Sequence, residues 1–452
     1  MSKRFNFQRI FLLMSTAGTL GLSNHAMAAA FQLWEQDGAS VGNYHAGRAA
    51  EAPDASTAYY NPAGLIRIHN QQVVFGLDPV LTNFKFNGTV NVNTAGLGES
   101  GPMQTTAQGG NFNLIPSLNY AAPLNDNNSV VFGFSVVSPF GLETNYGSNS
   151  PVRYTATLTS LQIIDIAPSL GIALNDKLSV GMGADFEHAR GEFNLVGGNP
   201  LLNQMFLMNM DTPSKNVGYS WGTGYHLGVL FQFTEATRAG LTYHSKVTEH
   251  LEGSSKFEGP LANDISGDPN GIQRSTNLKG NITLPATTTL SLFHSFNPTW
   301  DVMGTIAYTQ WDEFSKFVLQ NAAGLVDSMS SNTILVVIPE NYRNTWNYSV
   351  GANYHANEQW LFRAGVGYDE TPASGRYRNL QLPDSDRIPV AIGAHFQATK
   401  TLGFDAGWTH FFVMNTRINN LSETFGDQTT TTNGTVHGNA DVFGFQVKWD
   451  IV

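Results

Sequence analysis

Apolar and polar residues alternate strictly along many short stretches of this chain. From Leu178 to Phe186, every second residue is apolar, and the residues between them are Ser, Gly or Asp. The same pattern recurs in 360–369, 402–409 and 443–451. A strand turns successive side chains to opposite faces, so each stretch predicts a strand with one apolar and one polar face. A soluble sandwich also alternates, so the number and spacing of the strands must decide the fold class.

Fourteen strands are predicted, and the connections between them alternate in length. The short connections hold turn-forming residues, such as Asn175-Asp176 and Asn297-Pro298. An even number of strands, with short turns at one end and long loops at the other, is typical of a transmembrane barrel. The predicted strands are 71–86, 111–123, 129–137, 158–174, 177–190, 222–234, 237–252, 282–296, 299–317, 344–356, 358–369, 387–398, 401–414 and 440–451. The predicted long connections are 87–110, 138–157, 191–221, 253–281, 318–343, 370–386 and 415–439.

The physics of a lipid bilayer explains both the closure of such a sheet and the composition of the chain. No backbone group can stay unpaired in hydrocarbon, so a membrane-spanning sheet has to close on itself. Of the 452 residues, 41% are hydrophobic and only 13% are charged. Alternate residues face lipid, where a charge is costly, so low charge accompanies middling hydrophobicity. We therefore expect an all-β fold, a 14-stranded antiparallel transmembrane β-barrel over 71–452.

The first 28 residues have the features of a secretory signal peptide. Lys3, Arg4 and Arg9 precede a short apolar core, and residues 26–28 (Ala-Met-Ala) have the small-x-small form of a cleavage site. Removal of this segment takes away three basic residues and no acid, so the net charge changes from −11 to −14. An exported chain with this pattern is expected in the outer membrane of a Gram-negative cell. The acidic balance gives no support to a nucleic-acid partner, and the lack of cysteine excludes disulfides and thiolate metal sites.

Residues 29–70 show no sustained alternation, yet they carry too many apolar groups to lie in water. A fourteen-stranded barrel would otherwise enclose an open aqueous pore. We therefore predict that this segment folds inside the barrel as a plug, or hatch. Asn61-Pro62 is a turn signal near its end. The apolar residues of the segment are Phe31, Leu33, Trp34, Tyr44, Tyr59, Tyr60, Leu65 and Ile66.

Several short motifs resemble those of a known family. Residues 30–33 (Ala-Phe-Gln-Leu) and 61–63 (Asn-Pro-Ala) are similar to the hatch of the FadL/TodX-type outer-membrane transporters of long-chain fatty acids and other hydrophobic compounds. Residues 138–142 (Ser-Pro-Phe-Gly-Leu) resemble the third strand of that family. Residues 382–387 (Leu-Pro-Asp-Ser-Asp-Arg) resemble a family signature before a late strand. The motifs occur in the family's order over the whole mature chain.

The resemblance implies a path for a hydrophobic substrate. Family members capture the substrate at an apolar groove in the extracellular loops and pass it to a pocket near the mature N-terminus. They release it sideways through a kink in strand three. Pro and Gly both weaken a strand ladder, so the residues alone are equally consistent with an ordinary strand end. The positions implied are Phe31 in the pocket, Asn61, Pro62 and Ala63 in the hatch, and Pro139 and Gly141 at the lateral gate.

The predicted loop 191–221 holds a cluster of apolar residues. Leu201, Met205 and Met208 have the spacing of one face of a short helix. Flexible Met side chains adapt to varied alkyl shapes, so this surface is predicted to be a landing site for substrate. Packing against a neighbouring loop is the alternative. The resemblance makes the more polar loop 253–281 the other half of the groove. The substrate-binding residues expected in the apolar cluster are Leu201, Leu202, Met205, Phe206 and Met208.

Basic residues near the expected pocket depart from the family pattern. Fatty-acid transporters place basic groups where the substrate carboxylate rests, but those positions fall on Leu195 and near Val318. Arg190 and Lys316 are the nearby basic residues that could bind substrate instead, although neither aligns. The departure leaves open a fatty acid held differently or an uncharged hydrocarbon.

Three charged residues close to the start of the twelfth strand complete the set of candidates. Asp384, Asp386 and Arg387 belong to the late family signature and are predicted to form a structural ion cluster. Their close spacing in sequence allows ion pairing within the lumen or in a loop.

A passive channel for hydrophobic molecules is the function class that fits these features best. The plug and the apolar loop argue against a hydrophilic porin, and no residue constellation supports an enzyme or adhesin. The Gly-x-Ser-x-Gly motif at 218–222 is followed by a strand, where a hydrolase needs a helix, and the twelve His are dispersed. We expect no cofactor and no metal, a monomer, and contact with outer-membrane lipid. The expected substrate is a long-chain fatty acid or similar hydrophobic molecule; the alternative is an uncharged aromatic or aliphatic hydrocarbon.

Overall fold

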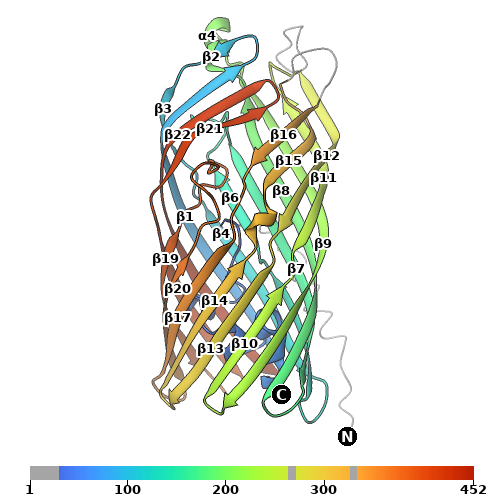
Figure 1. Ribbon diagram of the computed structural model, residues 1–452, viewed down its shortest axis with the longest axis vertical. Helices are drawn as coiled ribbons and strands as arrows, with labels where there is room; N and C mark the ends of the chain where they lie inside the picture. The colour runs from blue at the N-terminus through green and yellow to red at the C-terminus, as the bar shows by residue number, and fades with distance from the viewer. Residues whose placement is uncertain (1–29, 263–270, 326–332, 452) are drawn as a thin grey trace.

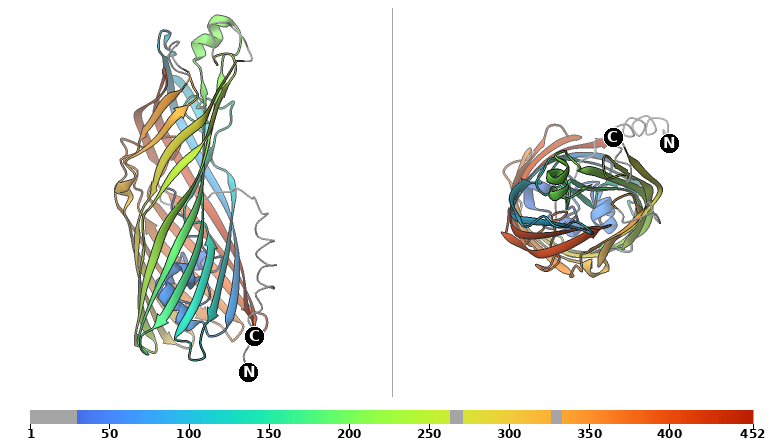
Figure 2. Two further views of the ribbon diagram at one scale, coloured as in Figure 1. Left: turned by 90° about the vertical axis from the view of Figure 1, so that its right-hand side faces the viewer. Right: turned by 90° about the horizontal axis from the view of Figure 1, so that it is seen from above.

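The chain forms one closed antiparallel sheet with a short segment inside it. The structure is a computed structural model that describes residues 30–262, 271–325 and 333–451. The sheet closes because the last strand, β22 (Gln428–Ile451), pairs with the first, β1 (Gln71–Thr94), from Gln71 opposite Ile451 to Thr94 opposite Gln428. Figure 1 shows the tilted strands from the side, and Figure 2 shows the closed ring from above. The predicted signal peptide lies outside the described residues and stays a prediction.

The described residues form fourteen wall strands, which confirms the predicted number. Seven wall strands are continuous: β1, β7 (Leu158–Ala173), β8 (Leu178–Gly197), β9 (Thr212–Thr234), β18 (Trp360–Asp369), β19 (Arg387–Gln397) and β22. Seven are divided in two: β3 and β4 (Met103–Gln108, Phe112–Pro123), β5 and β6 (Val130–Val137, Gly141–Asn145), β10 and β11 (Thr237–His244, Val247–Glu258), β12 and β13 (Ile272–Leu284, Thr287–Asn297), β14 and β15 (Trp300–Thr309, Lys316–Ala322), β16 and β17 (Ile334–Pro339, Thr345–His355), and β20 and β21 (Leu402–Val413, Thr416–Phe425). The short β2 (Gly98–Glu99) pairs with the end of β1.

Several of the predicted long loops are wrong, because much of their length is strand. The final wall strand begins at Gln428 rather than at residue 440, and β1 continues to Thr94 rather than ending at residue 86. The predicted loops 191–221, 253–281 and 318–343 are likewise partly strand. Residues 428–436 are rich in Thr and lack apolar alternation. Thr favours strands, and a strand beyond the bilayer needs no apolar face, so the lipid-facing pattern misses it.

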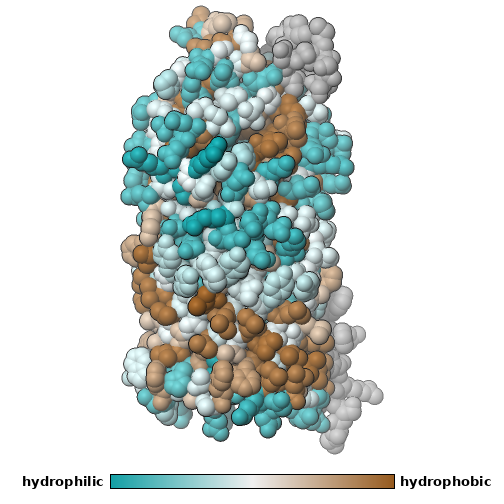
Figure 3. All heavy atoms as spheres, viewed as in Figure 1, coloured by the Kyte–Doolittle hydropathy of each residue, from teal (hydrophilic) through white to brown (hydrophobic). Residues whose placement is uncertain are grey.

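The outer surface carries an apolar belt below a polar upper half. Alternate residues of β18, β20 and β22 are exposed and apolar, among them Trp360, Trp408 and Trp449. Figure 3 shows the hydrophobic residues gathered over the lower part of the barrel and hydrophilic ones above. Within the described chain, no helix is long and apolar enough to cross a membrane.

The N-terminal segment lies inside the lower half of the barrel (Figure 2). It consists of short helices: η1 (Ser40–Asn43), α2 (Arg48–Glu51), α3 (Thr57–Tyr60) and η2 (Pro62–Arg67). The helix η1 contacts β19 and β20, and η2 contacts β7, β8 and β9. Wall glycines permit this closeness, because a Cβ on Gly240 would lie 1.8 Å from the carbonyl oxygen of Ala49.

The motif Asn61-Pro62-Ala63 fixes the end of this segment to the wall. The Asn61 side chain accepts a hydrogen bond from the Ala63 N–H at 3.1 Å, while its Nδ2 donates to the Ala49 and Val229 carbonyls at 2.6 and 3.1 Å. Asn61 and Ala63 are fully buried. Asp37 forms a buried ion pair with Arg48 within the same segment. These contacts hold residues 37–63 as one folded unit against the strands.

Candidate functional site

The third wall strand is interrupted where the sequence reads Ser138-Pro139-Phe140. Its lower part, β5, ends at Val137, and its upper part, β6, begins at Gly141. Pro139 has no N–H to donate to a neighbouring strand, so the ladder cannot continue through it. The interruption is at the predicted kink. We call residues 138–140 the wall break.

The N-terminal segment supplies the backbone partners that the wall break lacks. The Leu33 N–H donates to the Pro139 carbonyl at 2.8 Å, and the Gly141 N–H donates to the Phe31 carbonyl at 2.8 Å. Gln32 and Phe140 form an isolated antiparallel bridge between these two bonds. Phe31 and Leu33 are therefore hydrogen-bonded to the two sides of the wall break.

The neighbouring strand, β4, lacks a ladder partner on the side that faces the wall break. The β4–β5 ladder extends from Leu118 opposite Val136 to Pro123 opposite Val131. Among the described residues, β6 pairs with β7 and with no other strand. The residues of β4 above Leu118 therefore lack a ladder partner on this side.

Phe31 stands in an aromatic cluster next to the wall break. Its ring meets the ring of Trp311 edge-on at 4.7 Å and that of Phe314 at 5.3 Å, and it lies 6.0 Å from Phe140. Trp311 begins the short helix η3 (Trp311–Glu313), which divides the ninth wall strand between β14 and β15. Sequence reasoning placed Phe31 in an apolar pocket but missed Trp311 and Phe314. The prediction of one continuous strand over 299–317 is wrong at this point, because η3 interrupts it.

A pocket of about 40 Å³ opens beside Phe31. Its walls come from the third, fourth, fifth, eighth, ninth and tenth wall strands and from the loop before β19. Apart from Thr159, Gln381 and Glu340, every lining side chain is apolar. The lining residues are Phe31, Leu142, Thr159, Leu161, Phe193, Ile282, Phe314, Phe317, Ile338, Glu340, Gln381 and Leu382. We call this the Phe31 pocket.

The two basic candidates, Arg190 and Lys316, lie outside the Phe31 pocket. Arg190 shares the outer face of β8 with the exposed Met182 and Phe186, and its Nη2 is 2.5 Å from Glu192 Oε2. Lys316 is exposed on β15, whereas its neighbour Phe317 faces the pocket. Strand alternation explains both placements, because a residue next to a lumen-facing one points outward.

The two positions where the family pattern expects basic residues, Leu195 and Val318, face different surroundings. Leu195 packs against the lumenal apolar cluster that contains Phe31. Val318 lies on the same face of β15 as Lys316 and lines a cleft with it, away from Phe31. Among the residues that the structure describes, Glu340 is the only acid that lines the pocket, and it accepts a hydrogen bond from Asn379 Nδ2 at 2.9 Å.

One residue of the predicted ion cluster, Asp384, connects the loop 370–386 to Ala30. Asp384 accepts hydrogen bonds from the Ala30 N–H at 2.9 Å and from Thr371 Oγ1 at 2.6 Å. Burial raises the pKa of Asp384 above its ordinary value. Arg387 pairs with Asp369 at 2.5 Å, and Asp386 instead accepts from Tyr368 and from the Thr371 backbone. Asp384 and Asp386 thus share Thr371 as a partner, and Asp384 also holds this loop beside Ala30.

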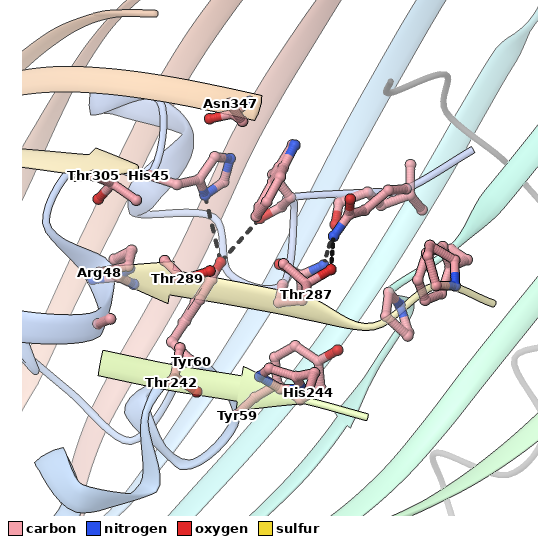
Figure 4. Close-up of a pocket in the computed structure, with 18 of the residues that line it drawn as sticks. His45, Arg48, Tyr59, Tyr60, Thr242, His244, Thr287, Thr289, Thr305 and Asn347 are labelled. Atoms are coloured by element: carbon pink, nitrogen blue, oxygen red, sulfur yellow. Dashed lines mark hydrogen bonds between the residues drawn. The ribbon is translucent and has the colours of Figure 1, made fainter. Parts of the chain in front are cut away.

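A second, more polar cavity lies below the Phe31 pocket, between the N-terminal segment and the wall. Phe140 borders it and also contacts the Phe31 ring, so the two spaces adjoin at the wall break. Burial lowers the pKa of His45, which lines this cavity, to about 3. Its imidazole is therefore neutral. Figure 4 labels the lining residues His45, Arg48, Tyr59, Tyr60, Thr242, His244, Thr287, Thr289, Thr305 and Asn347.

Part of the apolar cluster in the third long connection forms a helix, α4 (Pro200–Phe206), at the top of the barrel (Figure 1). The expected helical face is shorter than predicted, because Leu207 has a left-handed backbone and Met208 lies beyond the helix. The Asn199 side chain caps the helix by accepting from the Leu201 N–H at 2.9 Å. Leu202 is buried, and Leu201 is half-buried. Met205, Phe206 and Met208 are 64%, 54% and 49% exposed, so the predicted apolar surface faces outward.

These features together define a class of protein. A closed antiparallel barrel with an apolar outer belt, a folded segment in its lumen and an apolar internal pocket is a membrane-spanning β-barrel. The chain matches, over residues 19–451, the family described as outer membrane protein transport protein (OMPP1/FadL/TodX). The chain belongs to this family, and it is an outer-membrane protein.

Curated relatives cover nearly the full chain. The long-chain fatty acid transport protein of Escherichia coli O6:H1 is 26% identical over 428 residues, covering 90% of this chain and 91% of the relative. Outer membrane protein P1 of Haemophilus influenzae is 28% identical over 484 residues, covering 99% of each chain.

Solved structures share the fold. A Pseudomonas aeruginosa FadL homologue superposes with a TM-score of 0.77 at 24% identity, over 93% of this chain and 100% of that one. The toluene transporter TodX of Pseudomonas putida gives a TM-score of 0.64 at 20% identity, over 92% and 99%.

Proposed function

We propose that this protein carries long-chain fatty acids or similarly hydrophobic molecules passively across the outer membrane. The single observation that supports the route best is the contact between Phe31 and the wall break. Phe31 lines the apolar pocket with its ring, and its carbonyl accepts the Gly141 N–H at the edge of the break. A molecule that displaces Phe31 in the pocket would therefore disturb the seal of the wall.

The route would begin at α4 and end in the bilayer. The exposed Met205, Phe206 and Met208 offer an apolar surface of adaptable side chains to a substrate arriving from outside. The Phe31 pocket would hold the substrate next. Exit through the wall break would then deliver an apolar molecule sideways into lipid without passage through water. Exposure of the molecule to water would cost roughly 0.8 kcal/mol for each CH₂ group. Downhill partition supplies the driving force.

The second candidate substrate class, uncharged hydrocarbons, is favoured by one specific observation. Within the described chain, no Lys, Arg or His lines the Phe31 pocket, and its one ionisable side chain is Glu340. A buried carboxylate without a cation nearby costs several kcal/mol, so this pocket suits an uncharged ligand better than an ionised acid.

Removal of the N-terminal segment tests its proposed role as a plug. We expect a variant lacking residues 29–68 to conduct small ions and sugars, because the segment occupies the lumen that would otherwise form an aqueous pore. Single-channel conductance in planar bilayers measures this leak. Heat-modifiable migration on gels verifies that the shortened barrel has folded. Equal conductance of the full-length and shortened barrels would contradict the plug.

A further inference from the structure

Acidic and imidazole side chains gather on the inner wall of the barrel, opposite α3. Asp165 of β7, Asp185 and Glu187 of β8, His226 of β9 and His244 of β10 form this group, which we call the lumenal cluster. The three acids are 1%, 4% and 5% exposed, and His226 is fully buried. Asp185, Glu187 and His244 also line the lower cavity.

Strand register brings the cluster together. Asp165 lies opposite Glu187 in the β7–β8 ladder, and His226 lies opposite His244 in the β9–β10 ladder. On the β8–β9 ladder, a glycine faces each functional side chain: Gly183 faces His226, Gly224 faces Asp185 and Gly222 faces Glu187. A Cβ on Gly183 would lie 2.1 Å from the His226 ring. The wall is therefore shaped to accommodate these groups.

The carboxyl groups of the lumenal cluster have no Lys or Arg partner in the part of the chain that the structure describes. Among the ion pairs of the described residues, none joins Asp165, Asp185 or Glu187 to Lys or Arg. Asp185 is paired with His226 instead. Asp165 Oδ2 and Glu187 Oε2 are buried and have no hydrogen-bond partner. Buried polar oxygens are ordinarily hydrogen-bonded, paired or bound to a metal, so carboxyl oxygens without partners beside two imidazoles point to a cation.

Three members of the cluster have the spacing of metal ligands. One atom each from Asp185, His226 and His244 lies within 4.8 Å of the other two. The imidazole rings stack at 5.1 Å, and Asp185 Oδ1 lies 2.5 Å from His226 Nδ1. Two ligand atoms of a tetrahedral metal lie roughly 3.3–3.5 Å apart when the bonds are 2.0–2.2 Å. Asp185 Oδ1 and His226 Nδ1 therefore have to move apart by about 1 Å when the metal binds. A set of two imidazoles and one carboxylate suits Zn²⁺ and its neighbours in the first transition row.

We propose that Asp185, His226 and His244 bind a divalent first-row transition metal of the Zn²⁺ type. The site fastens the N-terminal segment to the wall. His226 Nε2 is 3.2 Å from the Ala58 carbonyl oxygen, and the Tyr59 ring packs 4.6 Å from His244 (Figure 4). The proposal is independent of the identity of the transported molecule.

Cobalt spectroscopy of the full-length protein tests the site. Chelator-treated protein in detergent is titrated with Co²⁺, which gives visible d–d absorption when bound by imidazole and carboxylate in a tetrahedral site. We expect one Co²⁺ per chain, displaced by Zn²⁺, and stabilisation of the N-terminal segment against protease by Zn²⁺. In Asp185→Asn and His244→Ala, affinity should fall roughly tenfold to a hundredfold or more, as loss of even outer-sphere partners does at metal sites.

The control is His188→Ala, because His188 lies on β8 close to the cluster in sequence but packs against Trp221 at 4.9 Å, outside the site. Its Co²⁺ affinity should equal that of the unaltered protein. Absence of a Co²⁺ spectrum with the unaltered protein would overturn the proposal, and this result does not depend on any variant folding. Equal affinity in His244→Ala and the unaltered protein would overturn it as well.

Discussion

Replacing Thr159 by phenylalanine is expected to reduce uptake of a hydrophobic substrate by roughly tenfold to a hundredfold. Thr159 is buried and lines the Phe31 pocket, whose free volume of about 40 Å³ cannot take a ring without displacing a neighbour. Overpacking costs about 1–3 kcal/mol, and a barrier raised by that amount slows passage by about this factor. Uptake of radiolabelled oleate and toluene by cells that lack their own transporter measures the effect.

The control for this variant is Thr288→Phe. Thr288 is exposed on the outer face of β13, opposite Tyr308, where a ring faces lipid instead of the lumen. Uptake should be unchanged in Thr288→Phe at equal amounts of folded barrel in the outer membrane. Unchanged uptake in Thr159→Phe would place the substrate path somewhere other than the Phe31 pocket.

A bulky β-branched residue at position 141 is expected to slow uptake by a similar factor while the barrel still folds. Gly141 is buried at the upper edge of the wall break and donates to the Phe31 carbonyl. In Gly141→Val the added methyl groups would fill the space through which a substrate has to leave. Binding to purified protein should persist, because the pocket is intact. The variant therefore separates binding from release.

Gly304→Val is the matched control for Gly141→Val. A Cβ on Gly304 of β14 would meet its nearest neighbour at 3.5 Å, an ordinary contact, and this strand is continuous there. Both variants add the same side chain to a wall strand. Normal oleate uptake in Gly141→Val would eliminate release through the wall break as the route.

Much of the fold follows from period-two alternation, because a lipid-facing strand has to be apolar on every second residue. The stretch from Leu178 to Phe186 predicts β8 for this reason, and all fourteen wall strands were predicted in this way. The upper parts of the strands were missed. Residues 428–436 pair with β1 in water, where no apolar face is needed, so nothing in their hydropathy distinguishes them from a loop.

The site was less predictable, because its residues meet through register rather than through sequence spacing. The family resemblance pointed to Phe31 and the wall break, and the structure places both at one point. Trp311 and Phe314 come from an interruption between two ladder segments, which periodicity does not describe. The dispersed histidines predicted no metal site, yet His226 and His244 lie opposite each other on adjacent strands. The proximity of His226 and His244 can be predicted only when the pairing and register of β9 and β10 are known.

Fluorescence quenching of Trp311 tests most directly whether hydrophobic molecules occupy the Phe31 pocket. Trp311 is fully buried with its ring 4.7 Å from Phe31, so a brominated ligand in the pocket lies close enough to quench its emission. Titration with 1-bromooctane and with a brominated fatty acid compares an uncharged ligand with a carboxylate. We predict saturable quenching by bromooctane that disappears in Trp311→Phe, and no tighter binding of the ionised acid. Saturable quenching that persists in Trp311→Phe, or none with either ligand, would contradict the account.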